Sequence, residues 1–272
     1  MKPLANRLLS FRQGRVNARA EARTQLIIRN NLEKRFYKRM NTLLRKFLNV
    51  QLYLYTEYGI SNAEVAAQAF NEDFIPLIQS HYKRVFQAVY KNNEDKYMSD
   101  RKADTFVFGT SIDFEAVVSN YFATRELVLA GVGLRMALRI SNLIESGRAN
   151  GLTLPQIARD VSTKFTAISR GRAALIARTE THNAASFANH AYHLTAEKNL
   201  GTKMIKQWVS TNDARTRSAH SIANGQSVDM NEDFIVGGVP MGYAGDSRGG
   251  ARNVINCRCI IIYADEADVV SN

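Results

Sequence analysis

Apolar residues recur at every third or fourth position along most of the first 200 residues, the spacing that places side chains on one face of an α-helix. From about residue 16 to residue 58 this stripe comprises Leu32, Phe36, Met40, Leu43, Phe47, Val50, Leu54 and Tyr58. The pattern predicts one long helix that stops at Gly59. Because a helix with one apolar stripe must bury it, we expect a helical hairpin or a partner chain against this face.

The same periodicity predicts further helices beginning at about Ser61, Asp113, Thr153 and Ser169. Ser61 and Glu64 form a capping-box pattern at the first of these starts. Pro76 is expected to kink or break that helix, and the polar stretch 91–104 is expected to be a connection. The segment from Thr153 is predicted to be short, and the last helix is predicted to end near Leu200.

After Gly201 the sequence becomes rich in glycine and in short β-favouring runs, notably 205–209 and 254–263, with a glycine-rich loop at 237–250. These features predict a mainly α protein with a small C-terminal α+β domain. We expect a basic helical N-terminal region over residues 1–115, a helical region over 116–200 and the α+β part over 201–272.

Positive charge is concentrated at the N-terminus. Residues 1–50 hold 13 Lys or Arg and 2 Glu, whereas the other 222 residues hold 23 basic and 23 acidic residues. The predicted contact residues in this arm are Arg12, Arg15, Arg19, Arg23 and Arg29. Such an arm suits an anionic partner, either the backbone of double-stranded DNA or an acidic protein surface.

Two negative expectations follow from composition. The most apolar stretch, 127–140, is interrupted by Arg135 and falls short of the roughly 18–20 residues needed to span a bilayer, so no membrane segment is expected. The only two cysteines, Cys257 and Cys259, are too few and too close for a disulfide framework, which favours a reducing, intracellular setting.

Those cysteines carry the strongest candidate chemistry. Residues at i and i+2 of a strand point to one face, so both thiolates could reach one ion. With His220, and Asp213 or His182 as a fourth ligand, they could form a closed structural zinc site. The alternative is that both are small buried residues of a terminal strand.

Charged residues upstream suggest a polar network. Arg178 and Glu180 on the last helix could pair with Asp213, Arg215 or Arg217 and so fix helix to loop. Alternatively Arg178, Glu180, Asp213, His220 and the cysteines could form a nuclease or transferase centre. Trp208 is interpreted as a core anchor, and His190 and His193 are interpreted as surface or capping groups.

A set of motifs in the C-terminal half resembles the Mu F-like head morphogenesis domain of tailed phages, over roughly residues 120–263. The motifs are Arg178-Thr179-Glu180, Trp208, Asp213-x-Arg215-x-Arg217-x-x-His220, Asn224-Gly225-Gln226, Phe234, Tyr243-Ala244-Gly245-Asp246 and Asn256-Cys257-Arg258-Cys259. Ala244 departs from the proline that the family usually has there, which affects the expected loop shape.

The resemblance implies a minor virion protein that is assembled in the host cytoplasm and lies inside the head near the portal vertex. Its implied partners are the portal protein and other head or scaffold proteins, and its implied roles are head assembly, DNA packaging or retention, and ejection. It does not imply catalysis. The alternatives are an enzyme built on the cluster around His220 and a sequence-independent DNA-binding protein using residues 1–50.

Overall fold

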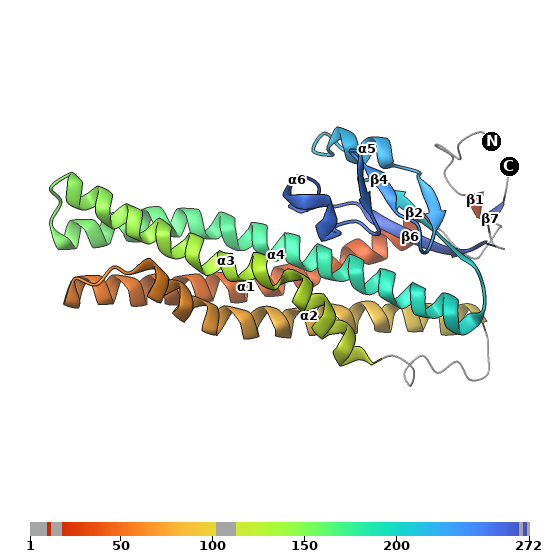
Figure 1. The fold of residues 1–272 in the computed structure, drawn as a ribbon, viewed down its shortest axis with the longest axis horizontal. Helices are drawn as coiled ribbons and strands as arrows, with labels where there is room; N and C mark the ends of the chain where they lie inside the picture. Colours follow the sequence, from red (N-terminus) through yellow and green to blue (C-terminus); the bar gives the residue numbers. More distant parts are fainter. Residues whose placement is uncertain (1–9, 12–17, 102–112, 267–268, 271–272) are drawn as a thin grey trace. The chain divides into compact units, whose positions relative to one another are not determined.

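The computed structural model describes residues 10–11, 18–101, 113–266 and 269–270. Four long helices make up most of the described chain: α1 (Ala18–Tyr58), α2 (Ala63–Arg101), α3 (Phe114–Ala149) and α4 (Leu154–Leu200). Short strands and short helices follow over the C-terminal residues (Figure 1). The predicted fold class, mainly α with a small C-terminal α+β part, is confirmed.

The chain divides into two compact units whose segments alternate along the sequence. Unit 1 contains Met1–Leu32, Tyr82–Tyr121 and Thr179–Asn272, and unit 2 contains Glu33–His81 and Phe122–Arg178. Each long helix therefore contributes one part to each unit. The predicted division at residues 115 and 200 stays a prediction. It was based on changes in charge, periodicity and glycine content along the sequence, whereas the two units are defined by contacts in space.

In unit 2 the predicted stripe of α1 is buried along its first half, at Phe36, Met40, Leu43 and Phe47. Beyond that point the buried positions are Leu48, Gln51 and Tyr55, whereas Val50 is 44% exposed and Tyr58 is 63% exposed. The prediction for Val50 and Tyr58 was wrong. A helix of 3.6 residues per turn follows Phe47 with position 51 as readily as with position 50, so the polar Gln51 hid the continuation.

Helix α2 begins differently from its predicted start. The Asn62 side chain accepts hydrogen bonds from the backbone N–H groups of Glu64 (3.0 Å) and Val65 (3.1 Å), so Asn62 and not Ser61 caps the helix. Pro76 lies inside the helix without breaking it. Phe74 and Ile78 on either side of it are completely buried, and this packing offsets the hydrogen bond that proline removes.

Two predicted interruptions are also absent. Helix α2 continues through much of the polar stretch that was predicted to be a connection and ends at Arg101. The short helix predicted from Thr153 and the helix predicted from Ser169 are one continuous helix, α4. Its start is fixed by Gln156, whose Oε1 accepts from Thr153 N–H (2.8 Å) and from Thr153 Oγ1 (2.9 Å).

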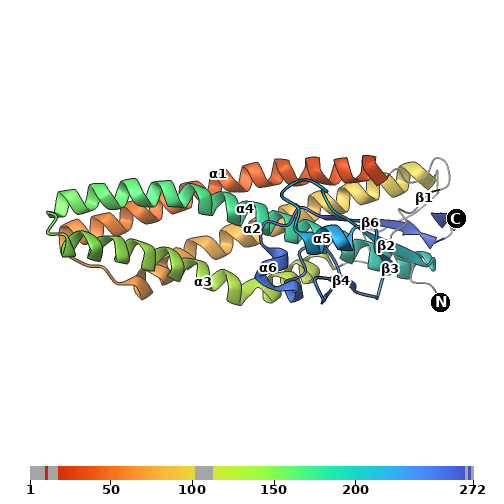
Figure 2. The same ribbon diagram turned by 90° about the horizontal axis from the view of Figure 1, so that it is seen from above.

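The C-terminal strands of unit 1 form an antiparallel sheet in the order β3-β2-β6. Its strands are β2 (Met204–Val209), β3 (Ser227–Asp229) and β6 (Ile260–Asp265). Trp208 on β2 is fully buried, as a core anchor should be, and packs edge-on against Phe234 with ring centroids 5.5 Å apart. Figures 1 and 2 both show these strands beside the C-terminal part of α4, where His193 stacks on Tyr263 (4.1 Å).

The remaining elements of unit 1 are short. They are the antiparallel pair β1 (Ser10–Phe11) and β7 (Val269–Val270), the helix α5 (Ser218–Ala223), the hairpin β4 (Phe234–Val236) and β5 (Val239–Met241), the 3₁₀ turn η2 (Ser247–Gly249) and the helix α6 (Gly250–Val254). The hairpin turns at Gly237 and Gly238, whose φ values of 61° and 79° suit a two-residue turn. The predicted glycine-rich loop thus contains the strand β5 and the 3₁₀ turn η2, and α6 begins at its last residue.

Helix α3 bears on the expectation of no membrane segment. By length and composition alone it is apolar enough to cross a membrane, and 39% of its most apolar 18-residue window is buried. A core helix of a soluble protein meets the same two criteria. The expectation therefore stays a prediction.

Candidate metal centre

Cys257 and Cys259 lie in the extended segment that leads from α6 into β6. The chain turns at Asn256, whose φ of 59° lies in the left-handed region that asparagine tolerates. Asn256 N–H donates to Thr179 Oγ1 on α4 (3.1 Å), and Cys257 N–H donates to the Val254 carbonyl (3.2 Å). The extended backbone after this turn sends alternate side chains to opposite sides, so the two cysteines share one side.

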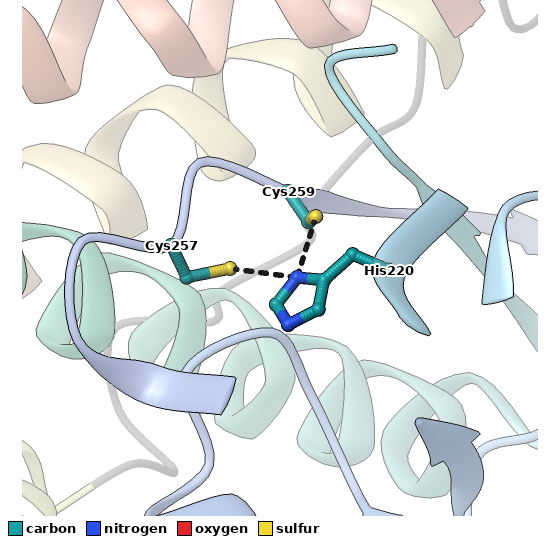
Figure 3. Close-up of side chains that lie close together, drawn as sticks. All are labelled: His220, Cys257 and Cys259. Carbon is teal, nitrogen blue, oxygen red and sulfur yellow. Dashed lines mark hydrogen bonds between the residues drawn. The ribbon is translucent and has the colours of Figure 1, made fainter. Parts of the chain in front are cut away.

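The two thiols meet the imidazole of His220, which α5 supplies (Figure 3). Nδ1 of His220 lies 3.6 Å from Cys257 Sγ and 3.3 Å from Cys259 Sγ. The ligand atoms of the three residues all lie within 4.8 Å of one another, and all three residues are buried. A group of two sulfurs and one imidazole in this arrangement could hold a metal ion.

The two thiols have opposite pKa shifts because they interact directly. A hydrogen bond from Cys259, followed by the charge and hydrogen bonds of His182 and His220, holds the pKa of Cys257 well below its ordinary value. The same interaction with Cys257, together with burial, raises the pKa of Cys259. The direct contact between the two thiols therefore makes Cys257 the more acidic of the pair.

Asp213, the predicted fourth ligand, lies elsewhere. Its carboxylate makes a two-point pair with the Arg258 guanidinium (2.6 and 2.7 Å) and accepts from Arg215 N–H (3.0 Å). The hydrogen bonds from Arg258 are the main reason that the pKa of Asp213 is lowered. Because Arg258 stands between the cysteines in sequence, alternation directs it away from them, and Asp213 with it. The prediction that Asp213 is a metal ligand was therefore wrong.

The predicted polar network divides into separate pairs. In unit 2, Arg178 pairs with Glu33 (3.3 Å). In unit 1, Glu180 accepts a hydrogen bond from the buried Tyr82 hydroxyl (2.6 Å). Arg217 donates to the Ile255 carbonyl (2.5 Å), and Arg215 reaches Asp213 only at 3.9 Å. Arg217 and Asp213 thus fix the loop before α5 to the segment that carries the cysteines.

The predicted contact arm is described only in part. Arg12 and Arg15 lie outside the described residues, and Arg19 is helical without a described side chain. Arg23 is exposed, as a contact residue requires. Arg29 is 7% exposed, and its guanidinium contacts His182 Nδ1 and the Cys259 carbonyl (3.4 Å). The prediction of Arg29 as a surface contact was therefore wrong, because Arg29 is buried beside the candidate metal centre.

Two histidines of α4 were also misplaced by the sequence interpretation. His193 is 3% exposed and donates from Nδ1 to the Asn189 carbonyl (2.7 Å). Its neighbour His190 lies near Tyr243 and Tyr263, with ring centroids 5.6 and 6.2 Å away. Within unit 1 both rings pack on tyrosines of the C-terminal segment, with His193 buried and His190 half-buried, so the interpretation as surface or capping groups was wrong.

Lys206 is a buried cation that the sequence interpretation missed. It is 1% exposed on β2, where Nζ donates to the Gly242 carbonyl (2.8 Å) and lies 5.2 Å from the centre of the Phe234 ring. Burial lowers the pKa of Lys206 to about 8. The available signal was alternation, since a strand with Trp208 buried must also bury position 206.

The loop after β5 is held by a second acidic–basic group. Arg248 makes two bonds to Asp233 (2.8 Å each) and also contacts Asp246 (2.7 Å). Asp246 is 4% exposed and accepts from Gly242 N–H (2.8 Å). Ala244 is fully buried within this loop, so alanine fits where the resembled family usually has proline.

Comparison with known proteins places this arrangement in context. Residues 139–262 match the family model described as phage Mu protein F like protein, a range that includes every residue of the candidate centre. The chain is 27% identical over 210 residues to minor head protein GP7 of Bacillus phage SPP1, covering 71% of this chain and 67% of that protein. It is 33% identical over 129 residues to the NAD(+)–arginine ADP-ribosyltransferase EFV of Enterococcus faecalis, covering 47% of this chain but 26% of the transferase. No solved structure matches the chain.

Proposed function

Because residues 139–262 of this chain belong to the Mu F-like family of phage proteins, we propose that the protein is a structural minor head protein of a tailed phage. It is a virion component that acts inside the head at the portal, in head assembly, DNA packaging or retention, or ejection. The observation that carries the proposal is the similarity to a phage minor head protein over 71% of the chain.

The proposal is tested by assembly. Full-length protein produced together with the portal protein of its own phage is expected to sediment with portal particles and to appear in purified heads in few copies. Protein that stays monomeric and binds neither portal particles nor DNA would contradict the proposal. An intact fold must first be shown by circular dichroism, so that a loss of binding is not a loss of structure.

Within that role, the buried group of His220, Cys257 and Cys259 is proposed to hold a structural zinc ion. The donor set fits zinc, which prefers thiolate and imidazole ligands. The nitrogen that would bind the ion is Nδ1 of His220, which faces both sulfurs at 3.3 and 3.6 Å. Bound zinc would hold α5 to the segment before β6.

The basic residues of positions 1–50 are proposed to bind packaged double-stranded DNA through its backbone. Support comes from the net charge of this region and from its exposed basic residues on α1, including Lys34, Arg35, Lys38 and Arg45. Contacts with phosphates release counterions, so this binding should be independent of sequence and strongly dependent on salt. An acidic face of the portal is the other partner that this charge suits.

We expect replacement of Arg12, Arg15, Arg19 and Arg23 by glutamine to weaken DNA binding and its salt dependence. Each lost phosphate contact lowers the slope of log K against log salt by about 0.9, so losing all four would lower it by about 3–4. Fluorescence anisotropy between 50 and 200 mM salt, about the range in which such contacts act, measures this.

The matched control removes the same charge from exposed arginines elsewhere, at Arg139, Arg159, Arg170 and Arg172. The control variant should keep most of the slope. Equal losses in both variants would show that net charge alone, and not the arm, binds DNA.

An enzyme is the second candidate, and the match to an ADP-ribosyltransferase is the observation that raises it. The match covers only 26% of the transferase, so the similarity gives no reason to assign the transferase activity to this chain. The geometry also disfavours a catalytic centre, because Asp213 and His220 lie on opposite sides of the cysteine segment and Glu180 bonds to Tyr82. We therefore propose that the protein is not an enzyme. Turnover of NAD⁺ or cleavage of DNA that disappears in a His220→Ala variant would overturn this.

A further inference from the structure

The structure assigns a fourth ligand to the proposed metal centre: His182 of α4, which with His220, Cys257 and Cys259 would enclose one zinc-like ion. This inference rests on the proposed zinc site and deepens it. It decides whether the site is closed, as in structural zinc centres, or keeps an open position for water, as in catalytic ones.

His182 faces the cysteine segment because α4 is docked there. Thr179, one turn earlier on α4, accepts the hydrogen bond from Asn256 N–H (3.1 Å). Asn183, the next residue, lies so close to Gly245 that an added Cβ there would be 2.3 Å from Asn183 Oδ1. Residues at i, i+3 and i+4 share a helix face, so the face that carries Thr179 and Asn183 also carries His182.

The His182 ring has one nitrogen engaged and one available. It is 4% exposed, and Nδ1 contacts the Arg29 guanidinium. Nε2 is buried, and besides Arg29 the ring hydrogen-bonds to the Cys257 thiol. His182 is not one of the three residues whose ligand atoms all lie within 4.8 Å of one another, so its ring must move toward the ion to complete the set.

Charge balance favours an imidazole over a carboxylate as the fourth ligand. Two thiolates already neutralise a divalent ion, and a second neutral imidazole leaves the buried site without net charge. Metal binding requires both cysteines as thiolates, so it is accompanied by the release of thiol protons to solvent. Coordination through Nε2 leaves the proton on Nδ1 of His182, so Arg29 must move its hydrogen bond to the Cys259 carbonyl, which it already approaches at 3.4 Å.

Asp213 is the alternative fourth ligand that the sequence offered, so it provides the comparison for His182. Since Asp213 is paired with Arg258 on the other side of the segment, its removal should leave the ion in place. A closed site would also tie α4 to α5 and to the segment before β6, three elements far apart in sequence.

The test uses full-length protein and zinc or cobalt as the probe. Wild-type protein is expected to retain one zinc per chain by mass spectrometry of metals. The affinity for zinc is measured in competition with a chromogenic chelator. His182→Ala should lower this affinity by more than the roughly 10–100-fold that is typical when a residue that only hydrogen-bonds to a ligand is lost. Asp213→Asn should still bind one zinc per chain, and the loss of the pair with Arg258 should weaken zinc binding by no more than about 10–100-fold.

Cobalt substitution gives a second reading that needs no variant. A closed site of two thiolates and two imidazoles should show intense tetrahedral visible absorption that added azide does not change. A spectrum changed by azide would overturn the assignment of His182 even if His182→Ala fails to fold.

The remaining outcomes separate the two proposals. Zinc bound equally by wild type and a folded His182→Ala variant would overturn the fourth ligand and leave the three-residue site. No zinc bound by wild type, or equal binding by Cys257→Ser, would overturn the site itself. Neither result touches the assembly test of the minor head function.

Discussion

Replacing Gly245 by alanine should destabilise unit 1 by about 2–5 kcal/mol, the largest effect that we expect from a single methyl group in this protein. The φ of Gly245 is +89°, where a side chain costs about 1–2 kcal/mol. The new Cβ would also stand 2.3 Å from Asn183 Oδ1 and 3.3 Å from Asn183 Cα. Asn183 is 1% exposed within α4, so it has no room to move away, and such overpacking costs about 1–3 kcal/mol.

The hairpin glycine Gly238 is the matched control. Its φ of +79° imposes a similar backbone cost, but an added Cβ would meet nothing within 4 Å. Gly238→Ala should therefore lower the free energy of unfolding by only about 1–2 kcal/mol. Urea unfolding followed by the fluorescence of Trp208, which reports on unit 1, measures both variants. Equal losses would show that Asn183 does not press on Gly245 and that α4 is docked differently.

The fold class could be predicted because the apolar periodicity is long and regular, but element ends could not. Where a polar residue stands on the buried face, as Gln51 does, the stripe is misread by one position. Pro76 was expected to interrupt α2 because local chemistry disfavours it, and the packing of Phe74 and Ile78 overrides that preference. Tertiary packing is not visible in a local pattern.

The candidate centre was predictable to the extent that it is local. Alternation in an extended segment places Cys257 and Cys259 together, and the same alternation places Arg258 and hence Asp213 on the other side. The position of Arg258 on the side away from the cysteines, which excludes Asp213 as a ligand, could thus have been predicted from the sequence. Arg29 likewise lies three, seven and eleven residues before the apolar Leu32, Phe36 and Met40, so the stripe itself placed it on the buried face.

The environment of His193 could not be predicted, because it depends on three segments that are distant in sequence. Its ring stacks on Tyr263 of β6, and Lys96 of α2 and Glu21 of α1 act on its charge. Burial lowers the pKa of His193 to about 4, with opposing contributions from the Asn189 carbonyl and Glu21. The nearby His190 has its pKa lowered to about 3, mainly by burial and then by Lys206.

These shifts predict that the protein is destabilised by acid well above the range in which carboxylates are protonated. A histidine in the unfolded chain takes up a proton near pH 6.5, whereas folded His193 stays neutral until about pH 4. As pH falls through this interval the unfolded state binds more protons, so the free energy of unfolding decreases. The stabilisation is complete above pH 6.5, and His193 alone accounts for a loss of about 3 kcal/mol by pH 4.

A His193→Phe variant isolates this contribution, because phenylalanine keeps the stacking on Tyr263 and has no proton to bind. The difference in unfolding free energy between the variant and wild type, from urea titrations at pH 7, 6, 5 and 4, should shift in favour of the variant as pH falls. Taking the difference cancels the other groups that titrate in this range, including His190. Tyr192→Phe on the same helix adds no titrating group and should follow wild type at every pH. A difference that stays constant from pH 7 to pH 4 would mean that His193 takes up its proton at the same pH in the folded and the unfolded chain, and that the packing of α4 on β6 admits water.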